Sequence, residues 1–243
     1  MKQEIEIQRK YYADTALQYD EMHGDEVEEQ LMALHLLASY IEFYQIRSVL
    51  DVGGGTGRTV IWLKDRFPDL IVKAIEPVEA LREQGYARGL SSEELMNGDG
   101  YNIPFEDNSF DLVCEFAVLH HVREPHRVVT EMSRVASKMI CISDCNFMGN
   151  GSTTLRLFKY VIFSLGLWKI ADWFKTRGKG YTISEGDGLA YSYSVYQDLA
   201  ICKKYWGKVR IMTTRGDSES YLGQITTAPH VLLIAFDKIT NKL

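Results

Sequence analysis

The residues with the clearest chemical meaning lie in the stretch VLDVGGGTGRTV, which begins at residue 49. An acid and three glycines follow one another there as D-x-G-x-G-x-G: Asp51, Gly53, Gly55 and Gly57. Glycine lets a backbone turn sharply and approach a ligand closely. A dinucleotide site wants G-x-G-x-x-G, but its last glycine would fall on Arg58 or Val60. The spacing therefore favours a smaller group, such as an amino-acid moiety with a ribose, over a pyrophosphate. A turn built for packing alone is the alternative.

Two more acids follow the next apolar runs. Glu76 ends the run IVKAIEP, and Asp99 lies in NGDGYNIPF. A carboxylate at the first position can accept both hydroxyls of a ribose. Asp99 could accept a hydrogen bond from an adenine amino group, with Tyr101 or Ile103 against the ring. One such acid is usually a cap or a loop residue, but three at successive strand ends beside a glycine turn indicate a nucleoside site.

Two adjacent histidines, His120 and His121, follow the apolar run DLVCEFAVL. Histidine suits a general base at neutral pH. We expect His121 to be the base, with a hydrogen-bonded structural histidine as the alternative. Asp144, in SDCN, could be a second acid or half of a metal site with Asn146. One acid and one amide are too few ligands to indicate a metal site. We therefore predict no metal.

Strands and helices alternate through most of the chain. The expected strands are Ser48–Val52, Ile71–Ile75, Glu94–Met96, Phe110–Glu115, Met139–Ser143, Lys208–Thr213 and His230–Phe236. The expected helices are Ile5–Tyr19, Glu26–Phe43, Thr59–Arg66, Val78–Arg88, Pro125–Ala136 and Val195–Tyr205. Continuous apolar strands separated by helices are typical of a parallel sheet covered on both faces. We expect an α/β, doubly wound sheet with its ligand crevice at the carboxyl ends of the strands.

We predict a single domain over residues 1–243. Residues 1–45 would form N-terminal lid helices, 46–146 the cofactor-binding core, 147–193 a substrate-covering insertion, and 194–243 a closing helix and strands.

The ordered motifs VLDVGGGTG, AIEP, NGDGYNIPF, EDNSFDLVCEFAVLHHV and EMSRV resemble those of class I S-adenosylmethionine-dependent methyltransferases, in the small-molecule (methyltransferase type 11-like) group. The resemblance covers about residues 45–145. It implies a Rossmann-like seven-stranded sheet whose last strand is antiparallel, with S-adenosyl-L-methionine as cofactor and S-adenosyl-L-homocysteine as product. It also implies site roles. Asp51, Gly53, Gly55 and Gly57 would hold the methionine part, Glu76 and Pro77 the ribose, Asp99, Gly100 and Tyr101 the adenine, and Phe116 would lie beside the sulfonium.

Some family features are missing. The stretch RVASKMICIS lacks the usual Lys-Pro-Gly-Gly turn. The stretch CEFA stands at the position where enzymes that methylate the exocyclic amines of nucleobases carry Asn-Pro-Pro-Tyr. We expect methyl transfer to an oxygen or nitrogen of a small molecule, such as a sugar, a secondary metabolite or a lipid-like acceptor. The alternatives are an RNA or protein methyltransferase, a catalytically silent cofactor-binding scaffold, and a nicotinamide oxidoreductase, which the glycine spacing disfavours.

Substrate choice should reside in the N-terminal helices and the insertion. Tyrosines suit a pocket wall, and we expect four of them to meet the acceptor: Tyr11, Tyr19, Tyr181 and Tyr191. The stretch Leu155–Phe174 is apolar nearly all round, with basic residues among and after it. It could be a buried lid helix, a helix resting on an anionic membrane, or a homodimer interface. The loop ISEGDG, residues 183–188, could contact a cationic or hydroxyl-rich acceptor or be a surface turn.

The charge is unevenly distributed. Net charge is −6, yet residues 151–215 hold 11 Lys and Arg against 4 Asp and Glu. The acidic remainder argues against a nucleic-acid partner. No signal peptide or spanning helix is evident, and the four cysteines lack metal-ligand spacing. We expect a cytoplasmic enzyme.

Overall fold

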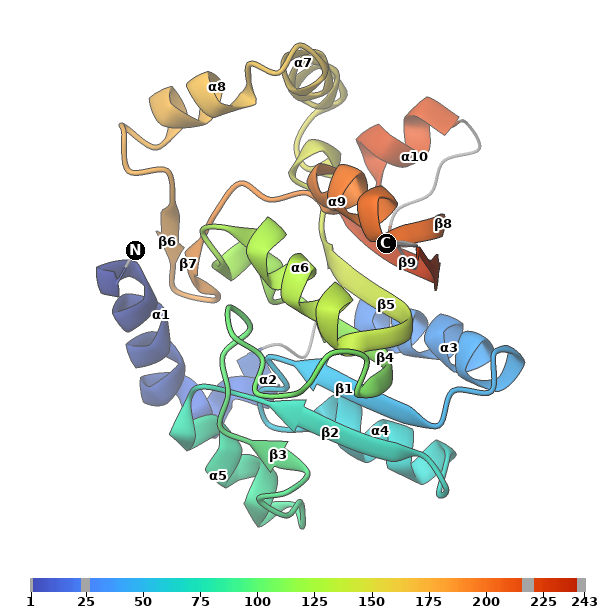
Figure 1. Ribbon diagram of the computed structural model, residues 1–243. Coiled ribbons are helices and arrows are strands. Elements are labelled where there is room, and N and C mark those ends of the chain that lie inside the picture. The colour runs from blue at the N-terminus through green and yellow to red at the C-terminus, as the bar shows by residue number, and fades with distance from the viewer. Residues whose placement is uncertain (1, 23–26, 216–220, 240–243) are drawn as a thin grey trace.

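The computed structural model describes residues 2–22, 27–215 and 221–239, and its centre is a seven-stranded sheet in the order β3-β2-β1-β4-β5-β9-β8 (Figure 1). The strands are β1 (Ser48–Val52), β2 (Ile71–Ile75), β3 (Leu95–Met96), β4 (Phe110–Phe116), β5 (Ala136–Cys145), β8 (Trp206–Arg215) and β9 (His230–Lys238). Strands β1 to β5 pair in parallel, whereas β9 runs antiparallel to both β5 and β8. The expected doubly wound sheet with an antiparallel last strand is confirmed.

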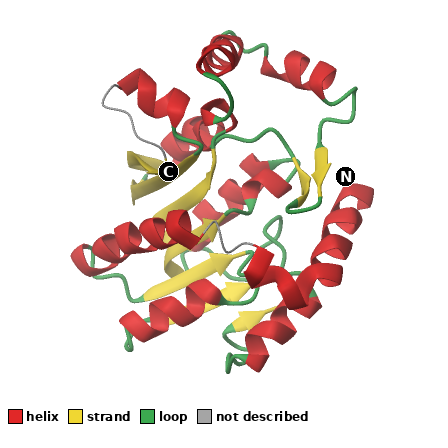
Figure 2. Cartoon of the chain, turned by 180° about the vertical axis from the view of Figure 1, so that it is seen from behind, coloured by secondary structure: helices red, strands yellow, loops and turns green. Residues whose placement is uncertain are grey.

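Helices cover both faces of the sheet (Figures 1 and 2). The helices of the described residues are α1 (Lys2–Thr15), α2 (Tyr19–Met22), α3 (Val27–Phe43), α4 (Arg58–Arg66), α5 (Glu79–Ala87), α6 (Pro125–Val135), α7 (Thr153–Ser164), α8 (Trp168–Lys175), α9 (Leu199–Tyr205) and α10 (Tyr221–Thr227). Of these, α7 and α8 lie away from the sheet (Figure 1). Apolar side chains alternate between the faces along each strand. Leu50 of β1 packs with α6, and its neighbour Val49 packs with α3 and α4. This two-sided burial explains why the strands are continuously apolar.

The expected elements of the core occur within a few residues of their predicted bounds. Glu26, the first residue of the predicted second helix, lies outside the described residues. The missing Lys-Pro-Gly-Gly turn has a simple structural result, because α6 ends at Val135 and β5 begins at Ala136 with no loop between them. The helix predicted over residues 195–205 begins as a 3₁₀ turn, Val195–Asp198.

The insertion departs from expectation. The single apolar helix predicted over Leu155–Phe174 is two helices, α7 and α8, separated around Gly166, whose φ of 72° is left-handed. Neither helix has a buried residue, so the interpretation as a buried lid helix is wrong. The chain then forms a hairpin of β6 (Thr182–Ser184) and β7 (Gly188–Ala190), which the sequence analysis did not predict. Within the described ranges, no helix combines the length and hydropathy that a membrane span requires.

Candidate functional site

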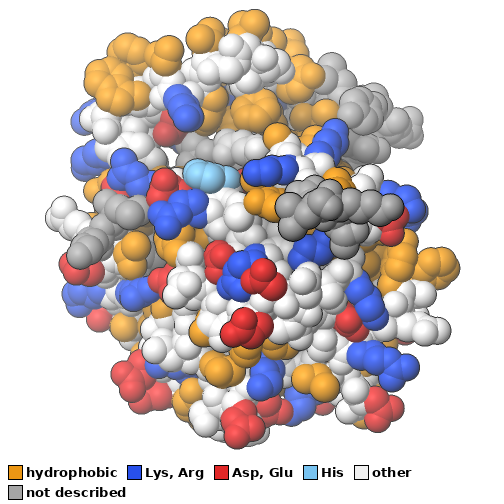
Figure 3. Space-filling view, in the orientation of Figure 1, with side chains coloured by type: hydrophobic (Ala, Val, Ile, Leu, Met, Phe, Trp, Pro, Cys, Tyr) orange, Lys and Arg blue, Asp and Glu red, His pale blue; other side chains and the backbone are white. Residues whose placement is uncertain are grey.

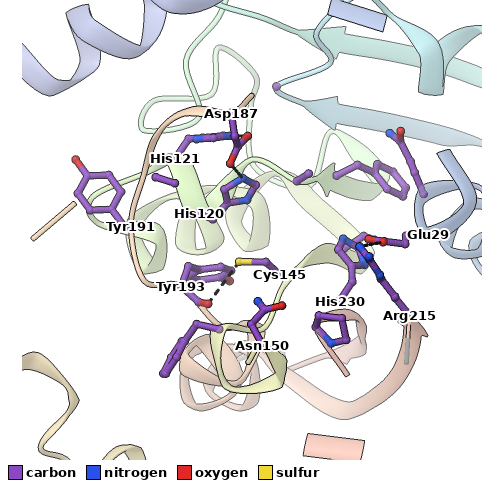
Figure 4. Close-up of a pocket in the computed structure, with 18 of the residues that line it drawn as sticks. Glu29, His120, His121, Cys145, Asn150, Asp187, Tyr191, Tyr193, Arg215 and His230 are labelled. Atoms are coloured by element: carbon purple, nitrogen blue, oxygen red, sulfur yellow. Dashed lines mark hydrogen bonds and ion pairs between the residues drawn. The ribbon is translucent and has the colours of Figure 1, made fainter. Parts of the chain in front are cut away.

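Two cavities lie at the carboxyl ends of the parallel strands. The smaller, of about 150 Å³, runs past the ends of β1, β2 and β3, and the larger, of about 330 Å³, runs past β4 and β5 (Figure 4). Seven residues line both: Tyr12, Tyr19, Gly53, Phe116, Ala117, His121 and Tyr191. The two spaces therefore meet at the end of β4, where a group held in one can reach a group held in the other.

Glu76 supplies a buried carboxylate to the smaller cavity. Its Oε2 accepts a hydrogen bond from the backbone N–H of Gly55 at 3.1 Å, and its Oε1 accepts one from Val78 at 2.8 Å. Burial raises the pKa of Glu76 to about 7. Each carboxylate oxygen has a second lone pair, so Glu76 can still accept the two hydroxyls of a ribose. Pro77 lines the same cavity.

The glycine turn keeps side chains out of the junction of the cavities. Gly53 and Gly55 have φ of 78° and 53°, which a side chain rarely tolerates. A Cβ on Gly53 would lie 2.6 Å from Val118, and one on Gly55 would lie 3.3 Å from the Tyr19 hydroxyl. Gly57 has a different role: it lines neither cavity and turns the chain into α4, packed against Leu90.

Asp99 and Gly100 form the far wall of the smaller cavity together with Tyr101. The Asp99 carboxylate accepts a hydrogen bond from the Tyr101 backbone N–H at 2.9 Å and pairs with Arg9 of α1 at 2.6 Å. Apolar side chains complete this wall: Val78, Leu81 and Val128. An apolar slot edged by a carboxylate is suited to a flat heterocycle that carries an amino group.

Asp51 is buried at the end of β1 and lines the larger cavity. Burial raises its pKa to about 7, and the nearby Glu76 carboxylate acts in the same direction. The Thr59 side chain is hydrogen-bonded to it and opposes this shift. Asp51 and Gly53 line the same cavity, and a carboxylate at this position can accept hydrogen bonds from an amino group.

His121 contacts three segments that are distant in sequence. Its Nδ1 is 2.7 Å from the Leu189 carbonyl oxygen of β7, and its Nε2 is 2.8 Å from the Tyr12 hydroxyl of α1. The Leu189 carbonyl oxygen and the Asp187 carboxylate, 3.2 Å from Nε2, can both only accept a hydrogen bond. Because the carbonyl oxygen is the closer of the two, we assign the proton of the neutral ring to Nδ1, which leaves the Nε2 lone pair facing Tyr12. Burial lowers the pKa of His121, and the neighbouring His120 lowers it further. The ring is therefore neutral at pH 7 and can take a proton.

His120 has the opposite electrostatics. Its Nδ1 is 2.7 Å from Asp144, and its Nε2 is 3.5 Å from Asp187 at the turn of the β6–β7 hairpin (Figure 4). Burial acts against the charged ring, but these two carboxylates prevail and raise the pKa of His120 well above its ordinary value. His120 is thus a charged ring that positions Asp187 beside His121 Nε2, at 3.2 Å.

The same side chains include potential metal ligands. Donor atoms of His120, His121 and Asp187 lie within 4.8 Å of one another, as do those of His120, Asp144 and Cys145. Hydrogen bonds and ion pairs within the protein account for these contacts, since Tyr12, Leu189 and the two acids engage the ring nitrogens. The absence of a catalytic metal stays a prediction.

The four predicted acceptor tyrosines separate into two groups. Tyr19 and Tyr191 line both cavities. Tyr11 instead packs on the hairpin, where its hydroxyl donates to the Glu185 carbonyl oxygen at 2.7 Å, and Tyr181 contacts the edge of the Tyr191 ring. Neither lines a described cavity.

Sequence reasoning assigned no role to several residues that line the larger cavity: Glu29, Cys145, Lys175, Arg215 and His230. It also assigned none to Gln8, whose amide nitrogen lies 2.9 Å from His121 Nδ1. Gln8, Arg9 and Tyr12 occupy one face of α1. Tyr12 lies three residues after Arg9 and four after Gln8, and residues at this spacing share a helix face. The spacing could therefore have indicated that these side chains act together.

Known proteins are similar to part of this chain. The family model described as "Methyltransferase domain" matches residues 50–139. A norajmaline N-methyltransferase of Rauvolfia serpentina is 32% identical over 96 residues, covering 37% of this chain and 32% of that protein. A demethylmenaquinone methyltransferase of Bacillus cytotoxicus is 33% identical over 123 residues, covering 46% and 52%. The chain thus spans about a third to a half of the length of these relatives.

Solved structures match over nearly the whole chain. One from Thermotoga maritima, described as a SAM-dependent methyltransferase and possible histamine N-methyltransferase, has a TM-score of 0.62 at 18% identity and covers 93% of this chain and 98% of that one. Another, from Methanococcus maripaludis and described as an S-adenosyl-L-methionine-dependent methyltransferase, has a TM-score of 0.58 at 17% identity, covering 96% of each. At these identities the likeness shows a shared fold.

Proposed function

We propose that this chain, whose residues 50–139 match the methyltransferase domain family model, is a class I S-adenosylmethionine-dependent methyltransferase that transfers a methyl group to an oxygen or nitrogen of a small molecule. One observation carries the proposal. The cavity that fits a nucleoside, with Glu76 and Asp99 on its wall, meets the larger cavity at Phe116 and His121. A reactive group at that junction would lie beside a neutral histidine.

The residues fit the cofactor at both ends. Glu76 keeps free lone pairs in a buried position, and the side-chain-free backbone at Gly53 and Gly55 leaves room at the junction. Bound S-adenosylmethionine supplies an electrophilic methyl group whose leaving group is already attached. The protein therefore has to orient the acceptor, exclude water and receive a proton.

The proton receiver is His121 Nε2. An acceptor hydroxyl or ammonium in the larger cavity would lose its proton to this lone pair, and the Asp187 carboxylate 3.2 Å away would stabilise the charged ring. His120 acts as a positioning residue, because Asp144 and Asp187 already hold it in the charged form. Tyr12 fixes the ring through its hydroxyl.

The acceptor is a molecule with both polar and apolar parts. Polar and apolar side chains both line the larger cavity: Phe147, Tyr193 and Pro229 on the apolar side, and Lys175, Asn150 and the Arg215–Glu29 pair on the polar side. The names of two relatives, a norajmaline N-methyltransferase and a demethylmenaquinone methyltransferase, support a small molecule as acceptor.

Calorimetric titration with S-adenosylhomocysteine tests the cofactor site. We expect micromolar binding by the wild type and at least tenfold weaker binding, about 1.4 kcal/mol, by Glu76→Ala and Asp99→Ala. The matched control is Glu79→Ala, an exposed acid two residues after Pro77 at the start of α5, and this variant should bind as the wild type does. Absence of binding by ligand-free wild type would remove the proposal.

An acceptor screen with His121→Ala then separates an enzyme from a silent cofactor-binding scaffold. Loss of turnover with unchanged S-adenosylhomocysteine affinity supports His121 as the base. RNA and protein acceptors belong in the same screen, and turnover on either alone would replace the small-molecule proposal.

A further inference from the structure

Helices α7 and α8 expose an unusual number of large apolar side chains. We call this surface the apolar cap; its members, each at least 45% exposed, are Leu155, Leu157, Phe158, Val161, Leu165, Leu167, Ile170, Trp173 and Phe174. Figure 3 shows hydrophobic side chains gathered along the top edge of the molecule, where Figure 1 places α8 and α7. Patches of this kind mark interaction sites, because exposed apolar surface costs free energy in water.

Ring contacts and hydrogen bonds anchor the cap to the body, and they fix which side faces outward. Trp168 at the start of α8 stacks on Phe147 with ring centroids 4.0 Å apart. On the opposite side, Trp173 and Phe174 are 57% and 69% exposed. The protein therefore holds this apolar face toward the outside.

Positive charge surrounds the cap. Six basic residues lie within or just after the two helices: Arg156, Lys159, Lys169, Lys175, Arg177 and Lys179. Over residues 153–180 the only acid is Asp172. Among the residues that the structure describes, none of the six cations forms an ion pair with a carboxylate. Two of the six are hydrogen-bonded within the protein: the Lys159 ammonium donates to the Phe147 and Asn150 carbonyl oxygens, and the Lys175 ammonium donates to the Ser192 hydroxyl. Apolar side chains rimmed by the remaining cations match the surface of an anionic lipid bilayer.

A second copy of the chain fits this surface less well. A two-fold dimer brings the same patch of both copies together, so the cationic rim would meet itself. The helices have 12 and 8 residues, too short to cross a bilayer and suited to lying in its headgroup region. We propose that the apolar cap docks the protein on an anionic membrane surface.

The cap is also continuous with the site. A cavity of about 470 Å³ separates α7 and α8 from α6, lined by Trp168 and Lys169 on one side and Val122 and Pro125 on the other. Tyr191, Ser192 and Tyr193 line both this space and the larger cavity of the site. We therefore extend the inference to the acceptor class, a lipophilic molecule that resides in the membrane. This extension rests on the proposed function, whereas docking does not.

Vesicle flotation of the full chain tests docking without requiring activity. We expect the wild type to float with vesicles of phosphatidylcholine and phosphatidylglycerol, to bind pure phosphatidylcholine vesicles far more weakly, and to be released by salt. Phe158→Glu with Trp173→Glu should weaken binding roughly tenfold or more, because charges replace inserted rings. Phe43→Glu is the matched control: this ring is 79% exposed on α3, outside the cap, and its loss should leave binding unchanged.

A charge variant and a fluorescence readout complete the design. Lys169→Glu with Arg177→Glu should weaken binding to anionic vesicles only. Brominated lipids should quench the fluorescence of wild type more than that of Trp173→Phe. Circular dichroism and S-adenosylhomocysteine binding show that each variant is folded, and failure of the cofactor site leaves the flotation result intact.

Three results would overturn the proposal. They are no flotation of a folded wild type, equal loss of binding in Phe43→Glu, and concentration-dependent dimerisation that the cap variants abolish. The last would assign the cap to a second copy of the chain.

Discussion

The hydroxyl of Tyr12 lies 2.8 Å from Nε2 of His121, and so joins helix α1 to the turn that follows strand β4. The two residues are 109 positions apart in the sequence. Their contact closes the first helix over the junction of the two cavities and fixes the direction in which the histidine lone pair points.

This contact predicts a specific loss in Tyr12→Phe. Removing the hydroxyl frees the His121 ring, and we expect kcat to fall roughly tenfold to a hundredfold with S-adenosylhomocysteine affinity within about twofold of wild type. Steady-state kinetics and calorimetry measure the two quantities. Tyr11→Phe is the matched control, since its hydroxyl bonds to Glu185 outside the cavities. Equal losses in both variants would contradict a positioning role for Tyr12.

The acid limb of the activity profile should lie below the ordinary range of a histidine. Burial and His120 lower the pKa of His121 below 6.5, and a base works only when it is neutral. Activity is therefore retained at neutral pH and lost as pH falls through the lowered pKa. In His120→Gln the positive neighbour is gone, so the limb should move to higher pH. A limb that stays in place or moves down would remove His121 as the base.

The ionisation of Asp51 and Glu76 should lower stability as pH rises across the acidic to neutral range. Asp51 and Glu76 have pKa values of about 7 in the folded protein, against 3.8 and 4.5 for the free groups. Below about pH 3 both the folded and the unfolded chain keep these two carboxyls protonated. As pH rises, these carboxyls lose their protons at a lower pH in the unfolded chain than in the folded protein. The free energy of unfolding therefore falls until about pH 7.

Urea unfolding at pH 5 and pH 8 checks this linkage. We expect the drop in unfolding free energy to be smaller in Asp51→Asn by about 1 to 3 kcal/mol. The exposed acid Asp69 offers a control, because Asp69→Asn should keep the wild-type pH dependence. An unchanged drop in Asp51→Asn would show that this carboxyl ionises at the same pH in both states.

Metal removal should have no effect on turnover. The nitrogen and oxygen atoms of His120, His121 and Asp187 are already satisfied by one another and by Tyr12, Leu189 and Asp144. Dialysis against a chelator should leave kcat unchanged, and elemental analysis should find less than one equivalent of any transition metal. A stoichiometric metal whose loss abolishes turnover would assign these side chains to coordination instead.

The sequence by itself determined the core of the fold and the cofactor end of the site. Strands β1 and β2 have their predicted bounds, Ser48–Val52 and Ile71–Ile75. Most residues of both strands are apolar and buried, and a glycine or an acid directly follows each strand. Glu76 and Asp99 could be placed at one crevice because the carboxyl ends of parallel strands lie along one edge of a sheet.

Only the tertiary structure decided the acceptor end. Local sequence does not encode which distant side chain meets a histidine, so the contacts of His121 with Tyr12 and Asp187 had no local signal. The hairpin of β6 and β7 was missed because its strands have three residues each, too few to show a period. The side on which α7 and α8 present their apolar residues was also undetermined. A helix that is apolar all round has no preferred face until its packing partners are known.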